Sequence, residues 1–464
     1  MTALDVFKQF EPYFVLTDEK MQEIVRCFRL EMEEGLANYG HDMAMIPAFV
    51  TGVPDGSEEG AFLALDLGGT NLRVCLVLLQ GNHKFQIKQQ KYKVSQALKE
   101  GESRELFDYI AESVDAFLTD VQAQDDIPIF ASSESMHLGF TFSFPVEQTA
   151  IDAGTLLTWT KGFSAKNAVG HDVVRLLQDA FDRKHMHVRC SALVNDTVGT
   201  LLSRSYQNGP ALIGAIFGTG TNGAFIDKTQ TIRKLGEERI RVEEALGEHA
   251  GKYMRRCLPI SIFDNKLDRE SINPRKQAFE KMISGMYLGE ITRNILLYMI
   301  DSNILFNGYS STILETHYGF DTSFVSAVEG ATTNDEVKSH IIHFLDVDSC
   351  HITEECLEIV RLACRVVSDR ACKLSACAIA AVVQHTGNDK APDRSVDKGV
   401  DIGMDGSVVE FLPRFNERVR TALEVLLGVE GAARIRMGLA KDGSGVGAAL
   451  TALQAKKALD ARKL

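Results

Sequence analysis

The sequence predicts an α/β protein built from two related lobes with a cleft between them. Two segments, residues 61–79 and 211–226, share one pattern, in which a strand leads into a turn rich in glycine and a second strand follows. Apolar residues at helical spacing alternate with further short apolar runs along the chain, which is typical of an α/β fold. The length of 464 residues allows two domains with substantial cores.

The composition is that of an ordinary soluble globular protein, with 45% apolar and 24% charged residues. A formal net charge of −13 argues against a general binder of nucleic acids or anionic membranes. We find neither a signal peptide nor an apolar run of membrane-spanning length, so we expect a cytoplasmic protein. The nine cysteines form no Cys-x-x-Cys pair, and we expect reduced, mostly buried thiols, with Cys372 and Cys377 in a helix core.

The turn of the first repeated segment has the residue types of a phosphate-binding loop. Gly68 and Gly69 let the backbone approach an anion with its N–H groups, and Thr70 adds a hydroxyl donor. Asp66 has the right chemistry to hold Mg²⁺ through water. Two glycines alone favour an ordinary hairpin turn, and no Walker A lysine follows. The second copy, at residues 218–221, shifts the interpretation toward one nucleotide held between two lobes.

Other elements follow from local patterns. Residues 107–121 predict a helix, and residues 51–60 predict a loop that suits a hinge before the first lobe. Residues 17–39 predict a helix with Thr17 as its N-cap. Its apolar stripe consists of Met21, Ile24, Val25, Phe28, Met32 and Leu36.

Two polar sites follow predicted strands in the first half. Residues 138–144 form a strand that Pro145 stops, and residues 159–163 hold the only tryptophan; alone, they indicate a half-exposed strand and a turn. A later strand ends at Asn195 and Asp196, where a helix begins at once. Ligands gather at the carboxyl ends of strands in open α/β sheets. Taken alone, however, Asp196 is better explained as an N-cap.

The C-terminal half contains four notable segments. Residues 279–290 predict one long helical run, and residues 321–326 form a polar strip. Residues 400–408 predict a third hairpin-like turn. The glycines of residues 438–450 suit a hinge followed by a closely packed helix that returns to the first lobe.

In this order, these motifs resemble those of eukaryotic hexokinases of the fungal glucokinase type, within the actin-like ATPase superfamily of ribonuclease H-like fold. The similarity extends from about Ile46 to Leu453. It implies a small domain of residues 60–193 plus 444–464 and a large domain of residues 1–55 plus 196–440. The implied hinges lie near residues 55–60, 193–196 and 440–444.

The resemblance implies ATP-dependent phosphorylation of D-glucose and other hexoses at the 6-hydroxyl, the first step of glycolysis. Asp196 would be the base, and Lys161 would also offset transition-state charge. The implied sugar contacts are Ser143, Thr160, Lys161, Asn195, Asp196, Asn222 and Glu290. Taken alone, Glu290 is a solvated glutamate on a helix face. The implied ATP contacts are Asp66, Gly68, Gly69, Thr70, Asn71, Arg73, Gly218, Thr219, Gly220, Thr221, Thr322, Ser326, Gly406 and Ser407.

The cofactors implied are ATP and Mg²⁺. The expected partners are a hexose and ATP, with no nucleic acid and no membrane, and the chain would be a monomer or a homodimer. The preferred hexose and any product inhibition stay open.

One segment departs from the family pattern. The family has Asn-Thr/Ala-Glu-Trp-Gly, with a sugar-binding glutamate, where this chain has residues 241–253; Ala245 or Glu248 takes the place of that glutamate, depending on the alignment. Arg275 follows Pro274 where the family has glycine. Three interpretations stay open for the segment: an error in the gene model, an altered sugar preference, or a hexokinase-like sugar sensor that has lost turnover.

Overall fold

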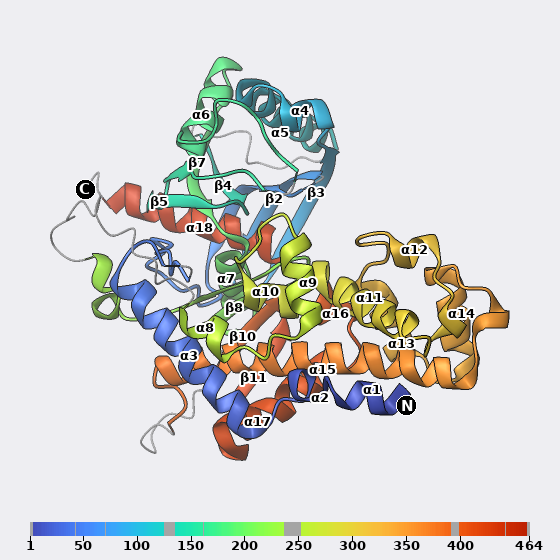
Figure 1. Ribbon diagram of the computed structural model, residues 1–464. Coiled ribbons are helices and arrows are strands. Elements are labelled where there is room, and N and C mark those ends of the chain that lie inside the picture. Colours follow the sequence, from blue (N-terminus) through green and yellow to red (C-terminus); the bar gives the residue numbers. More distant parts are fainter. Residues whose placement is uncertain are drawn as a thin grey trace.

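The computed structural model describes residues 3–41, 43–69, 71–124, 135–160, 162–235, 252–390, 399–440 and 442–461. Figure 1 shows two lobes, a smaller one above and a larger one below, with helix α18 (Gly443–Ala461) running beneath the upper sheet. Apolar side chains form one core cluster between residues 63 and 193 and a larger one between residues 6 and 435. The domain and hinge boundaries given above stay a prediction.

The small lobe is built on a mixed five-stranded sheet of order β3-β2-β1-β4-β7. β1 pairs antiparallel with β2, and β4 and β7 add in parallel on the other side. A separate pair, β5 and β6, lies outside this sheet. The elements are β1 (Glu59–Leu67), β2 (Asn71–Gln80), β3 (Phe85–Lys93), α4 (Gln96–Glu100), α5 (Ser103–Gln124), β4 (Met136–Phe142), β5 (Val146–Ala150), β6 (Ala153–Leu156), α6 (Val173–Arg183) and β7 (Val188–Val194).

The large lobe is built on a four-stranded sheet of order β11-β10-β8-β9. Its strands are β8 (Ala211–Phe217), β9 (Thr221–Phe225), β10 (Val400–Asp405) and β11 (Ile435–Leu439). The helices of this lobe that precede β8 in the chain are α1 (Ala3–Lys8), α2 (Glu11–Phe14), α3 (Asp18–Ala37) and α7 (Asp196–Asn208). Its other helices are α8 (Lys252–Cys257), α9 (Ile262–Glu270), α10 (Ala278–Ile283), α11 (Gly285–Asp301), α12 (Thr312–Glu315), α13 (Thr322–Gly330), α14 (Asn334–Leu345), α15 (Glu354–His385), α16 (Ser407–Phe411) and α17 (Phe415–Ala433). Short 3₁₀ turns occupy 229–231, 233–235, 306–308 and 349–351.

The two sheets repeat one topology, and this confirms the two predicted hairpins. In each sheet an antiparallel hairpin, β1–β2 or β8–β9, is extended by parallel strands next to its first strand. The predicted third hairpin at residues 400–408 is wrong. β10 pairs in parallel with β8 and β11, and after Gly406 the chain enters α16 instead of returning as a strand.

The predicted helices are confirmed, with one correction. Thr17 caps α3 by accepting a hydrogen bond from the backbone N–H of Lys20, and the predicted apolar stripe faces the core. The predicted helical run over residues 279–290 is interrupted, because Ser284 is extended (φ −93°, ψ 154°) and separates α10 from α11.

Helices α7 and α18 pack closely through glycines, as the small residues of the last segment predicted. A Cβ built on Gly447 of α18 would lie 2.1 Å from Cα of Gly199 of α7. A Cβ built on Gly139 of β4 would likewise lie 2.1 Å from the carbonyl oxygen of Ala448 of α18. α18 therefore contacts both α7 and the small-lobe strands β1, β4 and β7.

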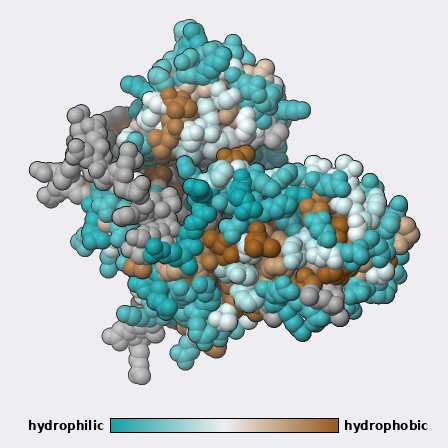
Figure 2. Space-filling view, in the orientation of Figure 1, coloured by the Kyte–Doolittle hydropathy of each residue, from teal (hydrophilic) through white to brown (hydrophobic). Residues whose placement is uncertain are grey.

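The cysteine prediction is correct for most thiols and wrong for one pair. Six of the seven described free cysteines are buried, including Cys372 and Cys377. Cys27 of α3 and Cys257 of α8 are joined in a disulfide, a pairing that 230 residues of separation concealed. On the face shown in Figure 2, hydrophilic side chains dominate and hydrophobic ones form separate groups. None of the described helices has the length and apolarity needed to cross a membrane.

Candidate active site

The N-terminus of α7 carries the proposed base. β7 ends at Val194, and Asn195 caps the helix: its Oδ1 accepts hydrogen bonds from the N–H (3.1 Å) and the hydroxyl (2.7 Å) of Thr197. Asp196 is thus the first helical residue, and the interpretation of Asp196 as the N-cap is wrong. Its half-buried carboxyl group lies where the helix dipole favours a negative charge.

A polar side chain of β9 comes to this helix end, and one of α10 comes to the preceding residue of β9. The side-chain amide of Asn222, on β9, donates to Oδ1 of Asn195 at 3.2 Å. Oε1 of Glu280, on α10, accepts from the backbone N–H of Thr221 at 3.0 Å. The structure therefore places Asn222 against Asn195 at the start of α7, next to Asp196 in the chain, and Glu280 against the backbone of Thr221, the residue before Asn222.

Glu290 has a different environment from the one predicted for a solvated helix-face glutamate, and that interpretation is wrong. The side chain is 1% exposed and pairs with Arg293, whose Nε donates to Oε2 at 2.7 Å and whose Nη2 donates to Oε1. Oε2 also accepts from the backbone N–H of Tyr318 at 2.9 Å. This buried pair ties α11 to the loop after α12.

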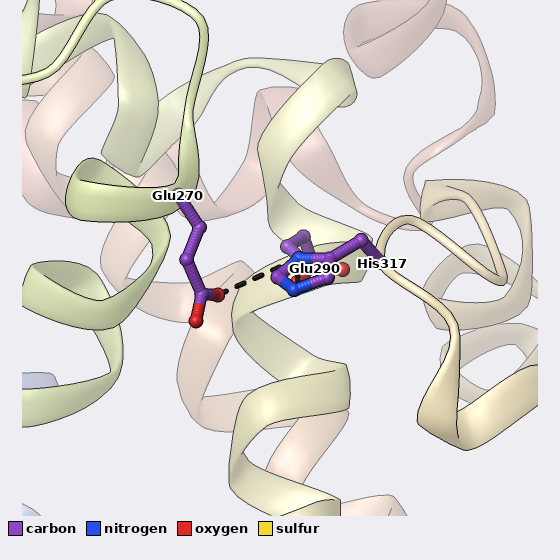
Figure 3. A group of neighbouring side chains, drawn as sticks. All are labelled: Glu270, Glu290 and His317. Carbon is purple, nitrogen blue, oxygen red and sulfur yellow. Dashed lines mark ion pairs between the residues drawn. The ribbon is translucent and has the colours of Figure 1, made fainter.

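Glu270 and His317 lie beside this pair (Figure 3). His317 Nδ1 is 3.5 Å from Oε2 of Glu270 and 3.8 Å from Oε1 of Glu290, so the three could be considered as metal ligands. Both oxygens of Glu290 already accept hydrogen bonds from Arg293, and a second cation beside that guanidinium would be repelled. The group is therefore better explained as an ion-pair network.

The small-lobe residues assigned to the sugar lie on loops after β4 and β6. Ser143 follows β4 directly and is half-buried, as is Thr160. The neighbouring Trp159 stacks on Phe163 with ring centroids 5.3 Å apart, and its indole N–H donates to the carbonyl of Ala165. These two contacts fix the conformation of the loop that follows β6. Lys161, Thr70 and Glu248 lie outside the described residues.

The β1–β2 turn, assigned to the nucleotide, carries a concentration of charge. Arg73 pairs with Asp66 at 3.2 Å and with Asp442, at the start of α18, at 3.5 Å. Asp405, at the end of β10, lies near both Arg73 and Asp442. Burial and the neighbouring acids Glu410 and Asp442 raise the pKa of Asp405 above its usual range, despite the hydrogen bond from the N–H of Gly406 and the charge of Arg73.

The turn closes on itself, since the N–H of Gly68 donates to the carbonyl of Asn71 at 3.0 Å. Both strands that it joins carry acidic or basic side chains at the same register, Asp66 opposite Arg73. Gly69 is half-buried, and Asn71 is exposed.

The β8–β9 turn brings together the large-lobe residues assigned to the nucleotide. The backbone N–H groups of Gly285 and Met286 donate to the carbonyls of Gly218 (2.7 Å) and Thr219 (3.1 Å). Gly406 has φ +115°, and a Cβ on it would lie 2.5 Å from the backbone of Phe217. Ser407 follows as the first residue of α16.

Helix α13 contacts the same region. The hydroxyl of Thr322 donates to the carbonyl of Gly285 at 2.6 Å and accepts from the N–H of Gly289 at 3.0 Å. Ser326 lies one helical turn further along α13 and is half-buried. The β8–β9 turn, α11, α13 and the β10–α16 turn thus converge on one place.

Three residues near these groups were missed by sequence reasoning: Glu280, Asp405 and Asp442. For Asp405 a signal was present, because an acid at a strand end followed by glycine and a hydroxyl residue repeats the pattern of Asp66 to Thr70. No local sequence pattern distinguishes Glu280 or Asp442 from the many other acidic residues of the chain.

Comparison with known proteins agrees with this geometry. Models of the hexokinase family match residues 6–206 and 212–454. A glucokinase from Aspergillus niger is 38% identical, covering 99% of this chain and 98% of its own length, and hexokinase-1 from Schizosaccharomyces pombe is 37% identical, covering 98% and 92%. The solved structure of a hexokinase from Schistosoma mansoni in complex with glucose matches with a TM-score of 0.81 and 32% identity, over 98% of this chain and 100% of that one.

Proposed function

Because the chain belongs to the hexokinase family, we propose that it transfers the γ-phosphoryl group of ATP to the 6-hydroxyl of D-glucose and related hexoses. The observation that carries the proposal is the contact of Asn222 with Asn195 at the start of α7, next to Asp196, with Glu280 bonded to the backbone of the adjoining Thr221. The glucose complex of the Schistosoma relative supports a hexose as the substrate.

The proposed roles follow from the chemistry of these side chains. Asp196 accepts the proton of the sugar's 6-hydroxyl as that oxygen attacks phosphorus. The amides of Asn195 and Asn222 and the carboxylate of Glu280 hydrogen-bond other sugar hydroxyls from the large lobe, while Ser143, Thr160 and Lys161 do so from the small lobe. Lys161 also offsets charge in the transition state. We assign to Glu280 the sugar contact that the resemblance gave to Glu290, whose carboxylate is committed to Arg293.

The nucleotide is proposed to lie between the two glycine-rich turns. The turns at residues 68–70 and 218–221 suit its phosphates, and the β10–α16 turn with Thr322 and Ser326 suits its adenosine. Because the N–H groups of Gly68, Gly218 and Thr221 donate within the protein, we assign the phosphate contacts of the described backbone to the N–H groups of Gly69, Thr219 and Gly220. Asp66, which pairs with Arg73, has the carboxylate chemistry that suits Mg²⁺ held through water. Bound Mg²⁺ would neutralise phosphate charge.

The first test is a coupled ADP-release assay with glucose over a wide concentration range, run beside Asp196→Ala and Asp196→Asn. We expect glucose-dependent turnover in the wild type and a loss of at least a hundredfold in kcat in both variants. If ADP release is absent while glucose still raises the melting temperature, the enzyme proposal is refuted and the sugar-sensor alternative, suggested by the departure at residues 241–253, takes its place.

A matched pair of variants tests the assignment of the glutamates. Glu280→Gln should raise the KM for glucose by roughly tenfold with little loss of stability, because a charge-assisted hydrogen bond is lost at a half-exposed site. Glu290→Gln should lower the free energy of unfolding by about 3 kcal/mol, because it breaks a buried ion pair. The reverse pattern would restore Glu290 as the sugar ligand.

Location in the cytoplasm, a place in glycolysis, and a monomeric or homodimeric state stay predictions of the sequence. So does the interpretation of residues 241–253, because residues 236–251 lie outside the described part of the chain.

A further inference from the structure

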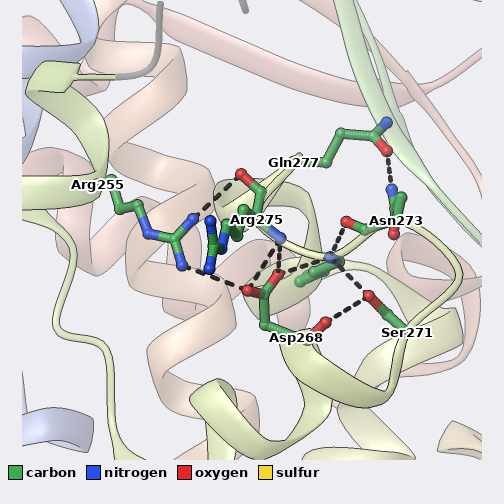
Figure 4. A network of polar contacts seen from close by, with 7 residues as sticks. Arg255, Asp268, Ser271, Asn273, Arg275 and Gln277 are labelled. Atoms are coloured by element: carbon green, nitrogen blue, oxygen red, sulfur yellow. Dashed lines mark hydrogen bonds and ion pairs between the residues drawn. The ribbon is translucent and has the colours of Figure 1, made fainter.

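A network of polar contacts forms around the residue that follows Glu280 in the chain (Figure 4). At its centre is Lys281, whose side chain is 4% exposed. Its ammonium group donates to Oδ1 of Asp268 at 2.8 Å, to the hydroxyl of Ser271 at 2.9 Å and to the carbonyl of Asn273 at 2.8 Å. All three donors of the lysine are therefore used, which is the condition under which a buried ammonium group is tolerated.

Asp268, at the end of α9, joins this lysine to two other parts of the chain. Its carboxylate accepts from the backbone N–H of Arg275 at 3.0 Å and from Nη2 of Arg255, on α8, at 3.3 Å. Nη1 of Arg255 also donates to the carbonyl of Arg275 at 3.1 Å. The Asp268 carboxylate of α9 is thus bonded to α8, to α10 and to the loop of residues 271–277.

The helix that carries Glu280 depends on such contacts for its position. α10 has only six residues, and a helix this short has little stability of its own. Its N-cap residue, Gln277, is in the left-handed region (φ +54°) and makes no side-chain capping hydrogen bond. Ser284 ends it in extended conformation. α10 is therefore held in place by its tertiary contacts: the packing of Phe279, Met282 and Ile283, the Glu280 bond to Thr221, and the Lys281 network.

Glu280 and Lys281 are neighbours on this helix, so their side chains leave it in directions about 100° apart. Lys281 enters the network, and Glu280 meets the N–H of Thr221 at the β8–β9 turn. An anchored Lys281 leaves α10 little freedom to rotate, and rotation of α10 would withdraw the Glu280 carboxylate from that turn.

We propose that Lys281 and Asp268 are positioning residues that act through Glu280, holding its carboxylate where the hexose binds. The inference rests on the proposed function and adds to it two residues that do not touch the substrate. It also makes Arg255, on the first described helix after residue 251, a contributor to sugar affinity through Asp268.

The test compares two chemically identical changes on one helix. Asp268→Asn weakens the pairing with Lys281, while Asp264→Asn weakens the pairing of α9 with Arg370 of α15 and removes no partner of Lys281. Both should lower stability. Only Asp268→Asn should raise the KM for glucose, by about tenfold, with a smaller change in kcat and none in the KM for ATP.

A double-mutant cycle separates positioning from general destabilisation. Lys281→Met should raise the glucose KM by about tenfold in the wild-type background and by less than twofold in a Glu280→Gln background, because its effect passes through that carboxylate. If Lys281→Met does not fold, Ser271→Ala, which removes one acceptor of the same ammonium group, replaces it in the cycle.

The outcomes distinguish the inference from the function on which it rests. Wild-type turnover with an unchanged glucose KM in Asp268→Asn, or additive effects in the cycle, would overturn the inference alone. If the wild type binds glucose without turnover, the same comparisons apply to the dissociation constant measured by calorimetry. A wild type that neither binds nor phosphorylates glucose would overturn both.

Discussion

The contact between α7 and α18 offers a sharp test of how closely this fold must pack. A Cβ at position 447 would lie 2.1 Å from Cα, 2.5 Å from the carbonyl carbon and 2.3 Å from the carbonyl oxygen of Gly199. All three are backbone atoms of a helix, so no side chain can move aside. For Gly447→Ala the helices must separate by about 1.3 Å to restore an ordinary 3.4 Å contact.

We expect Gly447→Ala to lower the free energy of unfolding by about 3 kcal/mol, at the upper end of overpacking costs, because two helices and the sheet beneath them must shift. Gly445→Ala is the matched control. Its Cβ would lie 3.5 Å from Sγ of Cys75, an ordinary contact, and alanine is favoured over glycine in a helix by about 1 kcal/mol. This variant should be as stable as the wild type or slightly more stable.

The separation should also reduce turnover. Gly199 lies one turn after Asp196, and Gly447 lies one turn after Gly443 and Asp442, which pairs with Arg73 of the nucleotide turn. A shift of about 1 Å between the proposed base and the nucleotide can reduce kcat by about a hundredfold. Urea denaturation and the ADP-release assay measure the two effects. Equal stability of the two variants would refute the close-packing argument.

Three further predictions follow from the described contacts. Arg275 has φ +68° and an exposed side chain, so Arg275→Gly should be about 1 kcal/mol more stable than Arg275→Ala in urea denaturation; equal stabilities would show that the conformation carries no strain. Gly406→Ala should raise the KM for ATP by at least tenfold, because its Cβ would meet the backbone of Phe217, whereas Gly387→Ala, also at positive φ but with open space around it, should change only stability. An unchanged ATP KM in Gly406→Ala would contradict this. Burial raises the pKa of Asp268, but the hydrogen bonds from Lys281 and from the N–H of Arg275, with the charges of Lys281 and Arg255, outweigh it and lower the pKa below its usual value. The stability that the Asp268 carboxylate contributes should therefore be constant above about pH 5. It should disappear as the pH falls from the unfolded pKa of about 3.9 through the lower folded pKa. The difference in unfolding free energy between wild type and Asp268→Asn, measured from pH 3 to 7, should therefore shrink at the acidic end, and a difference that grows there would refute the assignment.

The sequence by itself determined those features that depend on a few neighbouring residues. The two hairpins follow from strand patterns that flank glycine-rich turns, and the start of α3 follows from a threonine that can accept a backbone N–H. The closely packed last helix follows from its run of small residues. These signals are local, because the backbone hydrogen bonds and caps that produce them join residues that are close along the chain.

Only the tertiary structure decided which of several similar residues occupies a site. Asn195 and Asp196 are both favoured caps, and the choice depended on β7 ending at Val194. Glu280 and Glu290 lie in one helical pattern, but the break at Ser284 directs the first toward Thr221 and leaves the second to Arg293. The turn after β10 enters a helix at Gly406, which passes within contact of the backbone of Phe217. The pairing of Cys27 with Cys257 depended on α3 lying against α8. Each of these depends on distances between segments far apart along the chain, and such distances arise only when the elements pack together.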